Sequence, residues 1–278
     1  MNKINFHIHS IGSDGKLSPE DVVKEAIRAG ITYLCFTDHF KRPEGTTKKD
    51  GWDNNFYAED YAVEILNLKE KYKTQINIFI GAELDWLEGY EIWIKEVIHK
   101  NNFDFVLGSV HRVELDGEFI PVPLDEETLS NTLMKFKNDY KELVKKYYKQ
   151  QKLLVKSQLF DCVSHFDFVK MYNENNSLFS EKEEWYKRLV LENLELIKEK
   201  GMCLEINTAG WRYPIQEQYP SEWILIEARK KGIPITIGTD SHDLSVSEGL
   251  EEAYELARKV GYKSILIFKN RKSIEIQI

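Results

Sequence analysis

The chain has 278 residues, of which 42% are hydrophobic and 30% are charged, enough for one large α/β domain or two small ones. Its formal net charge of −8 argues against broad electrostatic binding to nucleic acid or to an anionic membrane, because both favour a basic surface. The first residues lead directly into a strand-like segment, and no apolar stretch is long enough to cross a bilayer, so we expect a cytoplasmic protein.

Short strand-like runs alternate with longer amphipathic segments along the chain. Strands are predicted at residues 4–9, 33–39, 76–85, 105–111, 161–167, 202–208 and 235–240, with a last apolar run at 265–268. Helices are predicted at residues 19–29, 58–72, 90–100, 126–154, 183–200, 220–231 and 246–260. Ser18 before Pro19 is typical of a helix start, and Gly30, Gly201, Gly232 and Gly261 stand where helix C-terminal caps belong.

Repeated strand–helix units predict a parallel sheet, which either stays open or closes as a barrel. Polar side chains follow every predicted strand, and they are listed in chain order as His7 and His9, His39, Glu83, His111, His165, Asn207, and Asp240 with His242. An open sheet gathers ligands at a switch point between a few strands, whereas a barrel brings every strand end around one mouth. We therefore predict a seven-stranded α/β barrel that forms a single domain over residues 1–278.

Two polar connections, residues 41–56 and 112–123, are predicted to lie at this mouth, either as solvated loops or as walls over a substrate. Cys35, Cys162 and Cys203 lie in apolar runs without CxxC spacing, which indicates reduced, buried thiols.

Six of the seven histidines belong to short clusters of imidazole and carboxylate groups. Because side chains alternate along a strand, His7-Ile8-His9 and Asp240-Ser241-His242 each direct two ligands towards one point. Imidazole and carboxylate ligands suit zinc, iron or manganese, and several together predict more than one ion. His99 is the exception, since it ends a predicted helix beside Lys100 and indicates a surface imidazole.

Seven short motifs in order carry a resemblance to a known family. They are His-x-His at 7–9, Ser-Asp-Gly at 13–15, Thr-Asp-His at 37–39, Gly-Ala-Glu at 81–83, Gly-Ser-Val-His at 108–111, Ser-His at 164–165 and Gly-Thr-Asp-Ser-His at 238–242. Together they resemble the polymerase and histidinol phosphatase (PHP) superfamily. The resemblance implies a distorted (β/α)7 barrel with two or three divalent metal ions, zinc, iron or manganese, at the C-terminal ends of the strands.

The same resemblance implies a ligand set for each ion. His7, His9, Glu83 and Asp240 would hold the first ion, with Glu83 bridging to a second ion held by His111 and His165. Asp14, His39 and His242 would hold the third. Asp38 and Glu205 are interpreted as hydrogen-bond partners of these ligands, the alternative being ordinary structural polar residues.

Adjacent cations activate a bridging water and clamp the oxygens of an in-line displacement at phosphorus, so the predicted chemistry is phosphoester hydrolysis by a bridging hydroxide held through Glu83. The sequence has no serine elbow or Cys/His pair that would supply a covalent nucleophile. Asp240 or His242 is predicted to protonate the departing alkoxide.

Phosphate needs further donors, and Arg212, Arg112, Lys170 and Asn207 are the candidates for substrate binding. Residues 205–212, Glu-Ile-Asn-Thr-Ala-Gly-Trp-Arg, resemble the histidinol-phosphate phosphatase branch of the family. The resemblance therefore implies a phosphomonoesterase that hydrolyses L-histidinol phosphate in histidine biosynthesis, with a small phosphorylated substrate and no nucleic-acid or membrane partner. Another small phosphate ester or a phosphodiester is the alternative substrate, and a non-catalytic metal-binding scaffold is the alternative function.

Overall fold

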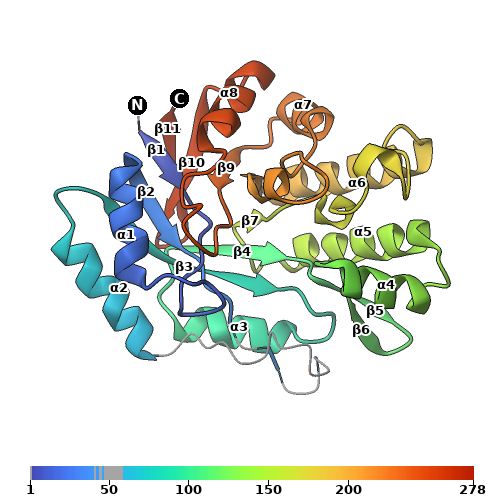
Figure 1. Cartoon of the computed structure of the whole chain (residues 1–278), viewed down its shortest axis with the longest axis horizontal. Helices are drawn as coiled ribbons and strands as arrows, with labels where there is room; N and C mark the ends of the chain where they lie inside the picture. Colours follow the sequence, from blue (N-terminus) through green and yellow to red (C-terminus); the bar gives the residue numbers. More distant parts are fainter. Residues whose placement is uncertain (1, 41, 44–45, 47–58) are drawn as a thin grey trace.

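The structure is a computed structural model that describes residues 2–40, 42–43, 46 and 59–278. Its main sheet has seven parallel strands in the order β1-β2-β3-β4-β7-β8-β9 (Figure 1). These strands are β1 (Lys3–Asn5), β2 (Ile31–Phe36), β3 (Asn77–Asp85), β4 (Phe105–Ser109), β7 (Cys162–Val163), β8 (Cys203–Asn207) and β9 (Ile235–Gly238). The predicted number and parallel direction of the strands are confirmed.

The first and last strands of the sheet meet and nearly close it into a barrel. The amide of Phe6 donates to the carbonyl of Ile237 at 2.9 Å, and the amide of His9 donates to the carbonyl of Ser241 at 3.0 Å. Ile8 and Ser241 form a parallel bridge just beyond the named strands. Closure brings the segments that follow β1 and β9 side by side, and both carry predicted ligands.

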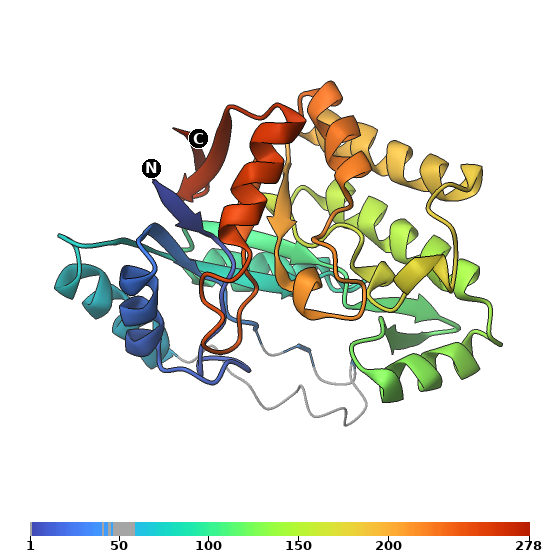
Figure 2. The same ribbon diagram turned by 45° about the horizontal axis from the view of Figure 1, so that its top comes forward.

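Helices surround the sheet, as Figures 1 and 2 show. They are α1 (Pro19–Arg28), α2 (Glu59–Lys71), α3 (Glu91–Lys100), α4 (Glu126–Lys135), α5 (Tyr140–Ser157), α6 (Glu184–Lys200), α7 (Glu222–Lys231) and α8 (Leu250–Val260). Ser18 caps α1 as predicted, because its hydroxyl accepts the amide of Asp21 at 3.1 Å. Within the described ranges, no helix combines the length and the apolar character that a membrane span needs.

The segment predicted as one helix over residues 126–154 is instead the two helices α4 and α5. Lys137 and Asn138 between them have φ angles of 52° and 62°, a left-handed conformation that a continuous helix excludes. Asp139 then caps α5 by accepting the amide of Glu142 at 3.0 Å. The single-helix prediction was therefore wrong at this break.

The polar connection predicted at residues 112–123 contains a β-hairpin, β5 (Arg112–Leu115) and β6 (Glu118–Pro121). Asp116 and Gly117 join its strands with φ angles of 51° and 81°, as a two-residue type I′ turn requires. The other predicted connection, residues 41–56, lies mostly outside the described residues.

A second hairpin, β10 (Ser264–Lys269) and β11 (Lys272–Gln277), closes the end of the barrel where the parallel strands begin. The ring of Phe268 stacks on Phe105 in β4 with centroids 4.7 Å apart. The amide of Arg271 in the hairpin turn donates to the carbonyl of Asp104, the residue before β4. The opposite end of the barrel, where the strands finish, is left for the site.

Candidate metal centre

All nine predicted metal ligands converge at the C-terminal end of the barrel strands. They form three groups in which the nearest ligand atoms lie within 4.8 Å of one another. The groups are His7, His9 and Asp240; Glu83, His111 and His165; and His9, Asp14, His39 and His242. Residues from six of the seven strand ends, all but that of β8, thus meet around one mouth, as the barrel hypothesis requires.

The first group has the spacing of ligands around a single ion. The Nε2 atoms of His7 and His9 are 3.1 Å apart, and they lie 3.5 and 3.3 Å from Oδ1 of Asp240. Zinc binds imidazole and carboxylate atoms at about 2.0–2.2 Å in a tetrahedron, which places neighbouring ligand atoms about 3.3–3.6 Å apart. The residues present therefore fit a divalent cation without rearrangement.

Glu83 joins the first group to the second. Its Oε2 lies 3.2 Å from Nε2 of His7 and 3.4 Å from Nε2 of His9. Its Oε1 lies 2.9 Å from Nε2 of His165 and 3.4 Å from Nε2 of His111. Since each oxygen faces a different pair of imidazoles, the geometry suits a carboxylate that bridges two cations.

The third group is wider than the other two. Oδ1 of Asp14 lies 3.2 Å from Nε2 of His242 and 3.7 Å from Nδ1 of His9, and Oδ2 lies 3.8 Å from Nε2 of His39. His39 also approaches Glu83, with its Nδ1 3.3 Å from Oε2. His9 therefore contacts two groups, whereas the family resemblance had placed it on the first ion alone.

The electrostatics of the centre favour positive charge. Burial opposes a charge on His9, but the carboxylates of Asp240 and Glu83 outweigh it and raise the His9 pKa to about 10. Burial likewise opposes the charge on Glu83, yet the surrounding histidines hold the pKa of this carboxyl well below its usual range. Burial lowers the His39 pKa to about 4. The buried carboxylates are thus stabilised as anions, and a cation beside them is the matching partner.

Hydrogen bonds on the far side of two imidazoles turn their Nε2 atoms towards the centre. Nδ1 of His7 donates to Oε1 of Glu205 at 2.7 Å, and Nδ1 of His111 donates to Oδ1 of Asp85 at 2.5 Å. Such carboxylate–histidine pairs fix the tautomer and orientation of metal ligands. Glu205 lies where the sequence predicted a partner, but Asp85 was missed, although Glu83-Leu84-Asp85 places two carboxylates on one face of a strand.

Asp38 and Asn207 support the ligands from outside the three groups. Asp38 accepts hydrogen bonds from the amide of Ser10 and the hydroxyl of Ser13, each at 2.7 Å, and so holds the turn before Asp14. The side-chain amide of Asn207 donates to Glu205 at 3.0 Å and to Asp240 at 3.2 Å. Asn207 therefore lies beside the ligands rather than among the residues that line the cavity.

A cavity of about 380 Å³ opens beside the ligands, and among the four predicted substrate contacts only Arg212 lines it. Nη2 of Arg212 donates to the carbonyls of Thr239 and Asp240 at 2.6 and 3.0 Å. Its Nη1 is buried and has no hydrogen-bond partner in the part of the chain that the structure describes. Arg212 thus lines the cavity and has one guanidinium nitrogen without a hydrogen-bond partner among the described residues.

Two predicted substrate contacts, Lys170 and Arg112, are buried and are not among the residues that line this cavity. Lys170 is fully buried, and its ammonium group contacts Asp167 at 3.0 Å, Glu217 at 2.8 Å and the Ser221 hydroxyl at 2.5 Å. Arg112 is also buried, and its Nη1 approaches the carbonyl of Phe119 in the hairpin at 3.5 Å.

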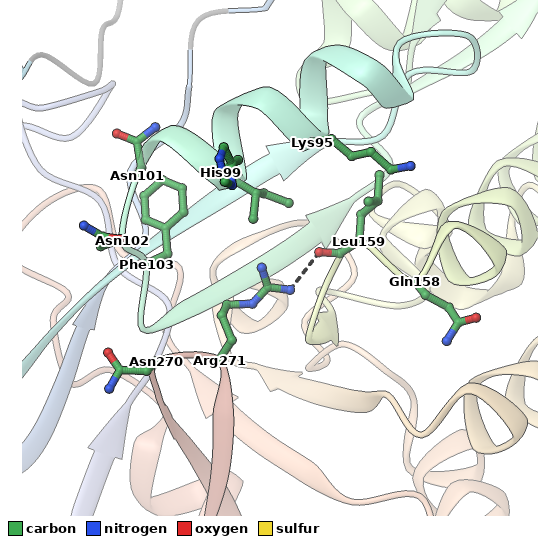
Figure 3. Close-up of a pocket in the computed structure, with 10 residues that line it drawn as sticks. Lys95, His99, Asn101, Asn102, Phe103, Gln158, Leu159, Asn270 and Arg271 are labelled. Carbon is green, nitrogen blue, oxygen red and sulfur yellow. Dashed lines mark hydrogen bonds between the residues drawn. The ribbon is translucent and has the colours of Figure 1, made fainter.

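A separate hollow of about 530 Å³ lies at the other end of the barrel (Figure 3). It is bordered by the end of α3, by Leu159, and by Arg271, which donates to the Leu159 carbonyl at 2.7 Å. His99 lies here in the last turn of α3 and is exposed, as predicted for a surface imidazole. It is therefore not part of the ligand groups.

Comparison with known proteins gives three concordant findings. The family model described as "PHP domain" matches residues 5–209. Histidinol-phosphatases from Lactococcus lactis and Bacillus subtilis are each 28% identical to this chain, covering 99% and 87% of it and 100% and 94% of their own lengths. A crystal structure of histidinol phosphate phosphatase from Lactococcus lactis, in complex with zinc, L-histidinol and phosphate, superposes with a TM-score of 0.79 at 28% identity over 98% of this chain and 99% of that one.

Proposed function

The chain belongs to the PHP domain family, and from this premise we propose that it is a metal-dependent phosphatase that hydrolyses L-histidinol phosphate to L-histidinol and phosphate. The observation that carries the proposal is the convergence of nine potential ligand side chains, Glu83 among them, at one end of the barrel. Relatives that align over nearly their whole length are histidinol-phosphatases, and one of them binds zinc, L-histidinol and phosphate. The substrate assignment comes from these relatives, whereas the metal chemistry comes from the ligand geometry.

We propose that the site holds two or three divalent ions, zinc, iron or manganese. His7, His9 and Asp240 would bind one, His111 and His165 would bind a second, and Glu83 would contact both. The third group, which includes Asp14, His39 and His242, would complete the centre. When bound, adjacent divalent cations lower the pKa of water and neutralise the oxygens of a phosphoester.

The protein's own groups would then bind the ester and handle its proton. Arg212 lines the cavity and would donate to a phosphate oxygen; its Nη1, which is unpaired in the described part of the chain, supports this role, since Nη2 is already bound to backbone carbonyls. Burial opposes the charge of Asp240, but His7 and His9 hold its pKa well below the usual range, so this group is a carboxylate at neutral pH. His242 also lines the cavity, and its imidazole could supply the proton to the leaving alkoxide only while it is not bound to the third ion.

A substrate panel tests this proposal. Metal-free protein is reconstituted with zinc, manganese or iron and assayed with L-histidinol phosphate, sugar phosphates, nucleotides and a phosphodiester. We expect the highest kcat/KM for L-histidinol phosphate. A substantially higher value for another ester would reject the substrate, and failure of the metal-replete protein to hydrolyse any ester would favour a non-catalytic scaffold.

A further inference from the structure

One wall of the cavity is contributed by the insertion between β4 and β7. Besides the predicted ligand His111, Leu124 and Asp125 at the start of α4 line the cavity from this insertion. The amide of Val122 donates to the carbonyl of the ligand His111 at 2.8 Å. Because Asp125 follows Val122 by three residues, its backbone lies within about 11 Å of that hydrogen bond.

The charged residues that line the cavity outside the ligand groups are Lys16, Asp125, Arg212 and Asp243. Nζ of Lys16 lies 3.7 Å from Oδ2 of Asp243, so these two charges offset each other. Arg212 is bound to two backbone carbonyls. Among the described residues no side-chain cation lies within ion-pair distance of Asp125, which makes it the lining carboxylate outside the ligand groups that has no ion-pair partner.

The backbone around Asp125 is held in place. Oδ1 of Asp125 accepts the amide of Thr128 at 2.6 Å, and the Thr128 hydroxyl accepts the amides of Leu124 and Asp125, each at 2.9 Å. The positive end of the α4 dipole stabilises the anion at this position. One carboxylate oxygen is used by the cap, and the exposed side chain keeps the other for a partner.

We infer that Asp125 binds a protonated amine on the alcohol portion of the substrate, and so selects esters with a cationic leaving group. The inference rests on the proposed phosphatase function and names the residue that would set its specificity. The metal ligands and Arg212 attract the anionic end of an ester, whereas a cationic end requires a carboxylate. Phe168 and Tyr213 also line this cavity, and aromatic rings beside a bound cation would favour it further.

The test compares two esters of similar size that differ in charge, O-phosphoethanolamine and ethyl phosphate, in parallel with L-histidinol phosphate. Asp125→Asn removes the charge but keeps a good helix cap, since asparagine caps as well as aspartate does. Glu126→Gln is the matched control, because Glu126 is the next residue, is exposed and does not line the cavity. Bound metal is measured for every variant.

We expect Asp125→Asn to lower kcat/KM for both amine esters by about tenfold, equivalent to about 1.4 kcal/mol, and to change it less than twofold for ethyl phosphate. Bound metal should stay constant, and Glu126→Gln should leave the ratio of charged to neutral ester unchanged. An unchanged ratio in Asp125→Asn would overturn the inference alone. Absence of hydrolysis of all three esters by the metal-replete wild-type protein would overturn the proposed function, and this inference with it.

Discussion

Replacing Glu205 with glutamine tests how the buried hydrogen bonds behind the ligands support the metal centre. Glu205 is fully buried, and each of its oxygens is an acceptor. Oε1 accepts Nδ1 of His7 at 2.7 Å, while Oε2 accepts the amide of His165 at 2.9 Å and the side chain of Asn207 at 3.0 Å. Glutamine has the same shape but supplies one acceptor and one donor.

Neither orientation of the glutamine amide can satisfy both sides. If the amide oxygen faces His7, the NH2 group faces two donors, the His165 amide and the Asn207 side chain. If the amide is flipped, the NH2 group faces the Nδ1 donor of His7 instead. The variant therefore loses at least one hydrogen bond to a charged acceptor, worth about 1.5–3 kcal/mol. That loss corresponds to about a 10- to 100-fold weaker affinity for the ion that His7 contacts, the range typical of such outer partners.

Competition with a zinc-sensitive chelating dye measures this affinity, and kcat/KM for the ester should fall with it. Glu195→Gln serves as the control, because it removes an exposed carboxylate that pairs with Lys231 on the outer helices. Circular dichroism of the metal-free proteins checks that both variants fold. If Glu205→Gln folds and binds zinc as tightly as the wild-type protein, the orienting role of Glu205 is refuted.

Three further predictions concern the phosphate, the protons and the buried lysine. Arg212→Ala should retain metal by elemental analysis but weaken inhibition by inorganic phosphate about tenfold or more, because a charge-assisted hydrogen bond is lost; unchanged inhibition would count against this contact. Burial opposes a charge on His9, but Asp240 and Glu83 raise its pKa to about 10, so this histidine is protonated at pH 7 in the metal-free protein. Zinc binding should therefore release protons at pH 7, and zinc affinity should rise with pH up to about 10. Calorimetric heats of zinc binding that do not depend on the ionisation enthalpy of the buffer would contradict this prediction. Lys170→Met should lower the free energy of unfolding by about 3–5 kcal/mol in urea, because the buried carboxylate of Asp167 loses its cation. KM should be unaffected; a raised KM with unchanged stability would identify Lys170 as a substrate contact instead.

The sequence was most informative where the same strand pattern determines both the fold and the position of the site residues. Strand ends carry the ligands, so locating the strands also located His39, Glu83 and His111 at one mouth. Helix starts and ends marked by a single capping residue, such as Ser18, were confirmed for the same local reason.

Features that depend on local turns or on distant partners were harder to predict. The Asp116-Gly117 turn is a hairpin signal, but it lies in a polar segment that was interpreted as a plain connection. The break in the segment 126–154 depends on two left-handed residues, neither of them glycine, and its amphipathic pattern continues across them. Lys170 follows a ligand strand as a phosphate contact would, yet its charge is held by Glu217 from another loop, which no local pattern reveals.

Anomalous diffraction from crystals of the metal-replete protein, recorded on both sides of the zinc absorption edge, tests the central claim directly. The account predicts at least two zinc peaks on opposite sides of the Glu83 carboxylate, about 3.5–4 Å apart, one beside His7 and His9 and the other beside His111 and His165. A map from fully active protein with no peak among these side chains would contradict it.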